Sequence, residues 1–483
     1  MLYLNKKHLS VEKEVRFMFS YVHLENFKSF KNITFDFHKN KREAKKMIAI
    51  YGENGSGKSN FVSAFDMLWM FLFSLPNHRI DDGMQRFIAL LKKSSDGSLD
   101  QKTIDSLIDS YGIKTNIPSF LEKCRTVECS DPTVVEFGFI LNSVEGHYTV
   151  KFSDQILFEE LYYLDNKRRT NLFTVSLRDN KIQADLSKVT ANKSYRKDIH
   201  ELVSKYWGKY SLWSILTEEI VQKNYSYITE KINHSVLEVM QHFMTTSASF
   251  LPSVPNVAVS NSSIQMAFPV KLDIDTGSTP VKNEKYLHQY EQLLTGYLSQ
   301  LCPDVVEAHY AIKYQGNDLF YELFLRKRIA GQIKEISIHQ ESTGTRKLID
   351  ELKPIVNVLY GFVSVYDEID SNIHDLLMKN LLSSLADHIP EGGQLIFTTH
   401  NTLLLEAIDP NFVYIINIDR DGSKEVNCCN DYDYKRIQQT NNLRNMYLKG
   451  MFGGIPYSSD IDFSFADSMN EKKSEDGTEG DRG

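Results

Sequence analysis

Eight residues near the N-terminus constrain the fold of this chain more than any other feature. Gly52–Ser59 reads Gly-Glu-Asn-Gly-Ser-Gly-Lys-Ser, which satisfies the pattern G-x-x-x-x-G-K-[ST] residue for residue. The apolar run Met47–Tyr51 before it is typical of a strand buried on both faces, and a helix is expected from about Ser59 to Phe73. A strand, a glycine-rich loop and a helix in this order predict a P-loop, in which backbone N–H groups and a helix N-terminus face phosphate.

The residues of this loop have distinct expected roles towards ATP and Mg²⁺. Lys58 is expected to reach the β- and γ-phosphates, and the Ser59 hydroxyl is expected to bind Mg²⁺. Further nucleotide contacts are expected from the residues around them, namely Asn54, Gly55, Ser56, Gly57 and Asn60. The alternative is a chance glycine-rich turn, which the buried strand and the helix on either side disfavour.

An acidic pair follows a second apolar run, far downstream. Asp367 and Glu368 come directly after Phe362–Tyr366, and ligands of open α/β sheets bind at the carboxyl ends of strands. Asp367 is expected to hold Mg²⁺ through water, and Glu368 to orient or deprotonate the attacking water. A solvated turn is the alternative for such a pair. The apolar run before it and the P-loop upstream favour the functional interpretation.

Strand and helix patterns predict an α/β fold with an antiparallel β subdomain and a helical insertion. Strand patterns occur at 17–51, 133–180 and 308–339, and a strand–helix alternation runs from 362 beyond 402. A chain of 483 residues is too long for one compact core. We expect an N-terminal ATPase lobe (14–184), a helical insertion and connection (185–300), a C-terminal ATPase lobe (301–458) and a disordered tail (459–483). Within the insertion, the proline-rich stretch 249–285 is expected to form loops.

Bulk properties favour a soluble, cytoplasmic protein. The net charge of -8 argues against a surface coated with basic residues, and the five cysteines show no CxxC pair, which is typical of a reducing compartment. The N-terminus lacks the apolar core of a signal peptide. The most apolar stretch, 67–73, is far shorter than the roughly 20 residues of a membrane-spanning helix, so no membrane contact is expected.

With these parts in place, the chain resembles the ABC-type ATPase heads of SMC, recombination-repair and OLD-family proteins, and most of all the AAA_15/AAA_21 ATPases of bacterial anti-phage defence operons. The similar segments correspond to the opening strand, Walker A, a segment that recurs in defence-type proteins, the ABC signature, Walker B with the D-loop, the switch histidine and a C-terminal signature. The opening strand corresponds to Leu24–Phe30, Walker A to Tyr51–Asn60 and the defence-type segment to Glu159–Tyr163. The signature corresponds to Glu341–Arg346, and Walker B with the D-loop to Tyr366–His374. The switch histidine lies in Phe397–Asn401, and the C-terminal signature is Leu443–Pro456. No motif matches between residues 185 and 300.

The resemblance implies an ATP site that a second subunit completes. Ser342 and the Gly344 N–H would meet the γ-phosphate across a dimer interface, at the start of a helix where anions are favoured. His400 would face the same phosphate from within the chain. The signature differs from the LSGGQ pattern at residues 341, 343 and 345, and a helix cap without a ligand is the alternative.

Other residues carry weaker expectations. Asp370 and Ser371 would lie at the dimer interface as D-loop residues, or cap a helix instead. Gln155 is a possible match to a glutamine that binds Mg²⁺ in this family, although a surface strand residue is the favoured interpretation. In the C-terminal signature, Arg444, Lys449 and the turn Gly453–Pro456 could dock a partner or brace the ATPase lobe, and we favour the bracing role.

Three functions remain open on the sequence. The first is an ATPase that forms a dimer or higher homo-oligomer and controls a separately encoded nuclease or toxin, like the ATPase subunits of PARIS, Septu and Rlo-type systems. The second is an SMC or recombination-repair-like ATPase that clamps DNA. It requires a basic surface, for which Lys39–Lys46 and Lys167–Arg169 are candidates, although each is more often a solvated loop. The third, a transporter motor, matches the insertions and the C-terminal signature poorly.

Overall fold

The computed structural model describes residues 16–94, 117–223, 225–248, 273–371, 373–432 and 443–455. The expected tail over residues 459–483 lies outside this part of the chain, and so does Pro456 of the C-terminal signature. Within it, two hydrophobic cores lie on the two faces of a central sheet. The α/β fold with an antiparallel subdomain and inserted helices is confirmed.

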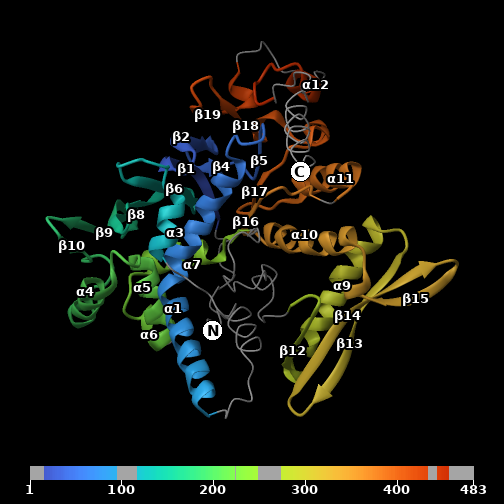
Figure 1. The fold of residues 1–483 in the computed structure, drawn as a ribbon, viewed down its shortest axis with the longest axis horizontal. Coiled ribbons are helices and arrows are strands. Elements are labelled where there is room, and N and C mark those ends of the chain that lie inside the picture. Colours follow the sequence, from blue (N-terminus) through green and yellow to red (C-terminus); the bar gives the residue numbers. More distant parts are fainter. Residues whose placement is uncertain are drawn as a thin grey trace, which may run out of the picture.

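The central sheet has six strands (Figure 1). In spatial order they are β11 (Ser247–Ala248), β16 (Val363–Tyr366), β17 (Gln394–Thr398), β5 (Met47–Gly52), β18 (Val413–Ile418) and β19 (Lys424–Cys428). Neighbours are parallel except β19, which is antiparallel to β18. In β5, Ile48 and Ile50 belong to one core, while Met47, Ala49 and Tyr51 belong to the other. This two-sided burial explains the continuous apolar run, because a strand covered on both faces favours apolar side chains at successive positions.

The helix after the P-loop, α1 (Lys58–Ser94), is much longer than the sequence predicts. It continues through Pro76, a residue that removes a helical hydrogen bond and usually ends or kinks a helix. Two hydroxyl groups beside α5 (Leu212–Lys223) satisfy the backbone there. The Ser211 hydroxyl donates to the Phe71 carbonyl, and the Leu75 N–H donates to Ser214 Oγ over 2.7 Å. The expected end at Phe73 was therefore wrong, because tertiary contacts compensate for the proline.

A seven-stranded antiparallel sheet covers one side of α1 (Figure 1). Its order is β10 (Lys181–Asp185), β9 (Arg168–Arg178), β8 (Ile156–Asp165), β7 (Val144–Phe152), β6 (Thr133–Leu141), β1 (Phe17–Phe27) and β2 (Phe30–Asp36). A small hairpin, β3 (His38–Asn40) and β4 (Glu43–Ala44), follows β2, and α3 (Ile117–Cys124) precedes β6. Alternate side chains of this sheet join α1, α5 and α7 (His234–Thr245) in the first core.

The inserted region contains helices α4 (Lys193–Tyr206), α5, α6 (Tyr225–Thr229) and α7 (His234–Thr245). In α7 the apolar residues recur at helical spacing and are buried, as predicted: Val236, Leu237, Val239, Met240 and Phe243. The expected loops over 249–285 need a correction, since β12 (Thr276–Pro280) pairs with β14 (Asp318–Ile329). Residues 249–272 lie outside the described residues.

A separate group of elements forms the right side of the molecule in Figure 1. It comprises β12, α9 (Glu284–Leu301), β13 (Val305–Gln315), β14 (Asp318–Ile329) and β15 (Gln332–Ser337), and α10 (Thr343–Leu359) connects it to the central sheet. The chain continues through α11 (Asp375–His388) and ends, in the described part, with α12 (Leu443–Leu448). The helix expected after residue 402 is a 3₁₀ turn, Thr402–Glu406. No helix among the described residues is long and apolar enough to cross a membrane.

One buried carboxyl group joins the antiparallel sheet to the inserted helices. Glu159 on β8 is fully buried and accepts hydrogen bonds from Trp207 Nε1 (2.8 Å), the Leu212 N–H (2.7 Å) and the Tyr148 hydroxyl (3.0 Å). Burial raises the pKa of Glu159 to about 7, while these donors oppose the rise. This contact gives a structural role to the segment Glu159–Tyr163, which the sequence matched only by resemblance.

Replacing Glu159 by alanine is expected to destabilise the protein by about 3 kcal/mol or more, since the buried donors would lose their acceptor. Thermal unfolding should report a Tm lower by about 5 to 10 °C. Glu160→Ala is the control, because the neighbouring side chain points to the opposite face and bonds the exposed Asn171 (2.7 Å). Equal Tm values for the two variants would contradict the role of Glu159.

The same group predicts a pH dependence of stability. The folded chain holds the Glu159 proton up to about pH 7, whereas an unfolded chain releases it near the ordinary value of 4.5. Folding therefore takes up a proton between these values, and stability falls as the pH rises through that window. Glu159→Gln cannot titrate and is expected to flatten this part of the Tm-against-pH curve. A curve of unchanged slope would argue against a protonated Glu159.

Candidate nucleotide-binding site

Three neighbouring strands of the central sheet end at one edge, and the candidate residues follow these ends. The P-loop follows β5, His400 comes shortly after β17, and Asp367 with Glu368 follows β16. Because β16, β17 and β5 are adjacent and parallel, their carboxyl ends lie side by side. Burial lowers the pKa of Lys58, and the charges of Asp367 and Glu368 act on it in the opposite direction. The fold thus brings together residues that are more than 300 positions apart.

Within the loop, Lys58 is held by its own backbone. The side chain is buried, and Nζ donates to the carbonyls of Gly52 (2.7 Å) and Glu53 (3.0 Å). A buried ammonium without a paired carboxylate is costly, and within the described part of the chain the hydrogen bonds of this one go to neutral carbonyls. The burial that lowers the pKa of Lys58 also strengthens its attraction for an anion.

The glycines of the loop allow a tight path that other residues cannot follow. Gly57 has φ +108°, and a Cβ there would lie 2.6 Å from the ring of Phe30. A Cβ at Gly52 would lie 2.6 Å from Ser56 Oγ. That Ser56 oxygen is fully buried and has no hydrogen-bond partner among the described residues. An unsatisfied hydroxyl beside a buried ammonium fits a phosphate oxygen, so the residues present are suited to a nucleotide.

Thr398, the last residue of β17, connects the acidic pair to the switch-histidine segment. Its hydroxyl donates to Asp367 Oδ1 and accepts the Glu368 N–H over 2.9 Å. Glu368 has φ +52°, a left-handed conformation that is uncommon for glutamate and that this N–H contact supports. Its carboxylate lies 3.1 Å from Nε2 of His400. Both side chains are about half exposed, with exposed fractions of 44% and 46%, so water can reach them.

The donors available for Mg²⁺ are a hydroxyl and a carboxylate. Ser59 is exposed at the start of α1, and Asp367 is buried at the end of β16. The described residues contain no cluster of three or more His, Cys, Asp or Glu side chains that would hold a metal ion by themselves. Magnesium bound with nucleotide needs only one or two protein ligands, since phosphate and water supply the others. Ser59 and Asp367 therefore fit a magnesium ion that arrives with phosphate.

The signature residues lie at the start of α10, apart from the P-loop. Ser342 is the N-cap, since its Oγ accepts the Thr345 N–H over 3.1 Å, and Gly344 lies in the first turn. Among the described residues, no hydrogen bond or ion pair connects Ser342 or Gly344 to the P-loop. Within the described part of one chain, these residues therefore make no direct bond to the P-loop.

The structure distinguishes between the alternatives given above for Asp370, Ser371 and Gln155. His374, not Asp370 or Ser371, caps α11, so the helix-cap interpretation of the latter two was wrong. Asp370 instead accepts a hydrogen bond from the Thr399 hydroxyl over 2.7 Å. Gln155 is exposed in the β7–β8 turn, as the favoured surface interpretation holds.

The C-terminal signature packs against the strands around the P-loop. Arg444 donates to Glu406 Oε1 over 3.1 Å. Gly454 lies so close to β18 that a Cβ would be 2.5 Å from the Ile415 side chain and 3.6 Å from Gly52 Cα. A side chain at this position would force the Ile415 side chain to move. These contacts are of the bracing kind, which the sequence favoured over partner docking.

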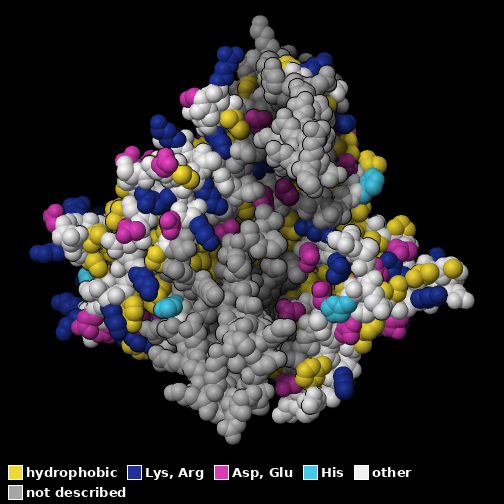
Figure 2. Space-filling view, in the orientation of Figure 1, with side chains coloured by type: hydrophobic (Ala, Val, Ile, Leu, Met, Phe, Trp, Pro, Cys, Tyr) yellow, Lys and Arg dark blue, Asp and Glu magenta, His cyan; other side chains and the backbone are white. Residues whose placement is uncertain are grey.

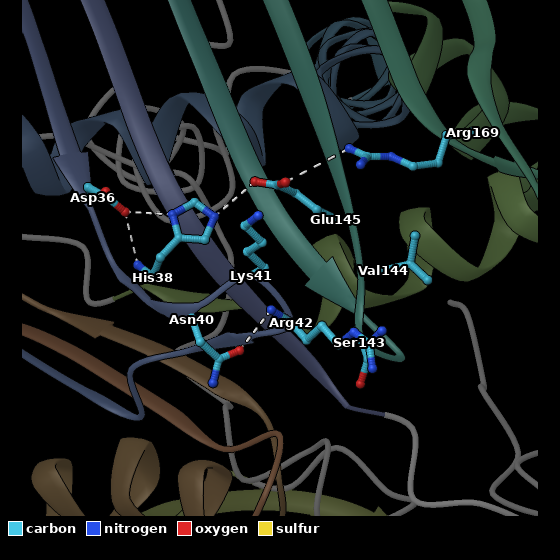
Figure 3. Close-up of a pocket in the computed structure, with 9 residues that line it drawn as sticks. All are labelled: Asp36, His38, Asn40, Lys41, Arg42, Ser143, Val144, Glu145 and Arg169. Atoms are coloured by element: carbon cyan, nitrogen blue, oxygen red, sulfur yellow. Dashed lines mark hydrogen bonds and ion pairs between the residues drawn. The ribbon is translucent and has the colours of Figure 1, made fainter.

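The two basic segments meet at an open pocket of about 570 Å³ on the antiparallel sheet. Figure 3 shows the His38 ring between Asp36 (2.6 Å) and Glu145 (2.9 Å), with Arg169 reaching Glu145 from the other side (3.8 Å). The hydrogen bond to Asp36, followed by that to Glu145, raises the pKa of His38. Lys41, which also lines the pocket, belongs to the first basic segment. On the face of the molecule drawn in Figure 2, basic and acidic side chains are interspersed.

Two residues of the site escaped the sequence reasoning. Thr398 was included only within a similar segment, although its hydroxyl contacts both members of the acidic pair. Lys424 on β19 donates to the Gly55 carbonyl of the P-loop over 2.8 Å. No motif marks it, because its position depends on β18 pairing beside β5.

Solved structures similar to this chain include three SMC heads. The SMC head domain from Thermotoga maritima is 14% identical with a TM-score of 0.34, covering 85% of this chain and 98% of that one. An SMC head bound to the C-terminal winged-helix domain of ScpA is 16% identical with a TM-score of 0.40 (85% and 96%). A Pyrococcus furiosus Smc head with an extended coiled coil, bound to the C-terminal domain of ScpA, is 14% identical with a TM-score of 0.37 (85% and 96%). Similarity at this level carries no inference about ligands or partners.

Sequence comparison gives a family. Among curated proteins, none matches the chain. The family model AAA_21, described as "AAA domain, putative AbiEii toxin, Type IV TA system", matches residues 47–406. The match starts at β5 and ends in the 3₁₀ turn after His400, so it includes the P-loop, the signature and the acidic pair. It extends over well more than half of the sequence, and the chain therefore belongs to the AAA_21 family of AAA-type ATPases.

Proposed function

We propose that this chain binds and hydrolyses ATP and that ATP controls its assembly with itself and with a separately encoded effector. The observation that carries the proposal is the convergence of Lys58, Asp367, Glu368 and His400 at the ends of three adjacent strands. A buried ammonium, an unsatisfied Ser56 hydroxyl and a nearby pair of carboxylates are the groups that phosphoryl transfer to water requires.

In this proposal each residue has a defined task. Lys58 leaves the Gly52 and Glu53 carbonyls and donates to the β- and γ-phosphates, while the loop N–H groups from Asn54 to Asn60 surround them. Ser59 and Asp367 hold Mg²⁺, which neutralises phosphate charge when bound. Glu368 accepts a proton from the attacking water or orients it.

In this proposal His400 contacts both the γ-phosphate and Glu368, the general base. Its Nε2 already lies 3.1 Å from the Glu368 carboxylate, so one hydrogen bond fixes the direction of both side chains. When nucleotide is present, the imidazole can turn its donor to a γ-phosphate oxygen. Both side chains are half exposed, which leaves the attacking water a way in.

We propose further that the ATP site is completed by a second copy. Ser342 and Gly344 lie at an exposed helix start that does not reach the P-loop of its own chain, so they are available to a nucleotide on a partner. The N-terminus of α10 carries the partial positive charge that a γ-phosphate would meet. Binding of ATP would then hold two chains together, and hydrolysis would release them.

A role in anti-phage defence is the proposed context. The family description names a putative toxin and a type IV toxin–antitoxin system, which supports a toxin-related context for the chain. The test is to co-express the chain with the product of a neighbouring gene and to purify the complex with and without ATP and Mg²⁺. ATP-dependent co-purification is expected. A partner that binds equally well to a Lys58→Ala chain would contradict nucleotide control.

A DNA clamp is the second candidate, and the pocket in Figure 3 favours it, since Lys41, Arg42 and Arg169 converge there. Asp36 and Glu145 in the same wall reduce the attraction for a phosphate backbone. DNA binding that weakens steeply with salt would support this candidate. The effector proposal instead expects weak binding that is unchanged by a combined Lys41→Ala, Arg42→Ala and Arg169→Ala substitution.

A further inference from the structure

Lys424 lies on β19, the antiparallel strand at the edge of the central sheet, and reaches the outside of the P-loop. Its Nζ donates to the Gly55 carbonyl (2.8 Å) and to Ser29 Oγ (2.7 Å). The ammonium also lies 5.5 Å from the centre of the Phe30 ring, the ring that packs against Gly57. One side chain therefore contacts the tip of the loop and the β1–β2 turn beneath it.

The contact on Gly55 determines which way the loop presents its N–H groups. All described peptide bonds are trans, and in a trans peptide the C=O and the following N–H point in opposite directions. With the Gly55 carbonyl directed outwards to Lys424, the Ser56 N–H points inwards, where it now donates to the Glu53 carbonyl (3.1 Å). A phosphate oxygen in the loop would meet this N–H already oriented.

The same lysine connects the loop to the first turn of α1. Ser29 Oγ, its second acceptor, also receives a hydrogen bond from Asn60 Nδ2 over 2.7 Å. Asn60 follows the candidate Mg²⁺ ligand Ser59. Lys424 itself is fixed because β19 pairs with β18, and Ile416 of β18 pairs with Gly52 at the base of the loop. The β18–β19 pair therefore contacts the P-loop at its base, through Ile416, and at its tip, through Lys424.

The charge of Lys424 has no counter-ion in the described part of the chain. Its hydrogen-bond partners there are a carbonyl and a hydroxyl, both neutral. Burial lowers the pKa of Lys424, which reflects the cost of removing a cation from water. An anion in the P-loop would offset that cost, whereas a purely structural contact would not need a charged group.

From this geometry we infer that Lys424 is a positioning residue for the nucleotide phosphates, holding the Gly55–Ser56 peptide in its binding orientation. The inference rests on the proposed ATP binding and adds a residue that lies outside every motif of the chain. It acts on binding of the diphosphate unit, so ATP and ADP should depend on it alike. It does not touch the reacting atoms, so the rate at saturating ATP should change little.

The test compares Lys424→Met, Lys424→Gln and Lys424→Arg with the wild type, and uses Arg420→Met as the control for charge lost from the same hairpin. Isothermal titration with ATP and with ADP gives Kd, steady-state assays give kcat and KM, and thermal unfolding checks the fold. Lys424→Met is expected to weaken both nucleotides about tenfold, with kcat within about twofold. Lys424→Arg should restore most of the affinity.

The outcomes distinguish a failure of the proposed ATP binding from a failure of the proposed role of Lys424. If the wild type binds no nucleotide, the proposed function fails and this inference fails with it. If the wild type binds but Lys424→Met has the same Kd, only the role of Lys424 is overturned. If Lys424→Met does not fold, Lys424→Gln replaces it, since glutamine keeps an N–H donor without the charge. Wild-type affinity in that neutral variant would equally overturn the role of the cation.

Discussion

Replacing Lys58 by alanine is expected to weaken ATP binding by about 100-fold or more, because charge-assisted hydrogen bonds to phosphate are each worth about 1.5 to 3 kcal/mol. The lysine is buried, its Nζ donates to two loop carbonyls, and the charges of Asp367 and Glu368 act on it, so alanine removes the cation that would face the phosphates. Titration with a labelled ATP analogue measures the effect directly.

The control for Lys58 is Lys197→Ala, an exposed lysine on α4 far from the P-loop. Its affinity for ATP should equal that of the wild type. The fold should survive in Lys58→Ala, since the hydrogen bonds lost are two contacts to carbonyls of the loop itself. Unchanged binding of the analogue by a folded Lys58→Ala protein would contradict the assignment of the P-loop.

Glu368→Gln is expected to keep ATP binding but to slow hydrolysis by about 10² to 10³-fold, the range that loss of a general base produces. Glutamine has nearly the same shape as glutamate and can still form a hydrogen bond with His400. Its backbone N–H can still donate to the Thr398 hydroxyl, so the site should remain assembled. ATP would accumulate unhydrolysed, and dimers held by it should persist.

Two measurements address this variant. Single-turnover hydrolysis gives the rate of the chemical step, and sedimentation with ATP and Mg²⁺ gives the fraction of dimer. Glu391→Gln is the control, an exposed glutamate that pairs with Arg16 at another edge of the molecule. Hydrolysis at the wild-type rate by Glu368→Gln would exclude Glu368 as the base.

Much of the site was predictable because its residues stand in strong local context. A continuous apolar run before Gly52 marked a strand buried on both faces, and a mostly apolar run before Asp367 marked a second buried strand. Both strands are confirmed. Strand ends in a parallel sheet share one edge, so the meeting of Lys58 and Glu368 followed from fold class alone. Fold class alone did not predict that β17 lies between these two strands.

The structural features that were not predicted from the sequence depend on contacts between distant segments of the chain. The extension of α1 past Phe73 relies on the Ser211 and Ser214 hydroxyls, which satisfy the backbone around Pro76. The strand at 276–280 forms because β14 offers a free edge, although its own residues resemble a loop. Lys424 likewise acquires its contacts only through the pairing of β18 with β5.

The most direct test of the composite site mixes two inactive chains. Lys58→Ala removes the P-loop function and Ser342→Arg blocks the signature, so each homodimer should be inactive. In a mixed dimer, the intact P-loop of the Ser342→Arg chain meets the intact signature of the Lys58→Ala chain. Mixing equal amounts should recover about a quarter of the wild-type ATPase rate if sites act independently, since half of the dimers carry one working site. A mixture no more active than either variant alone would contradict a site shared between two copies.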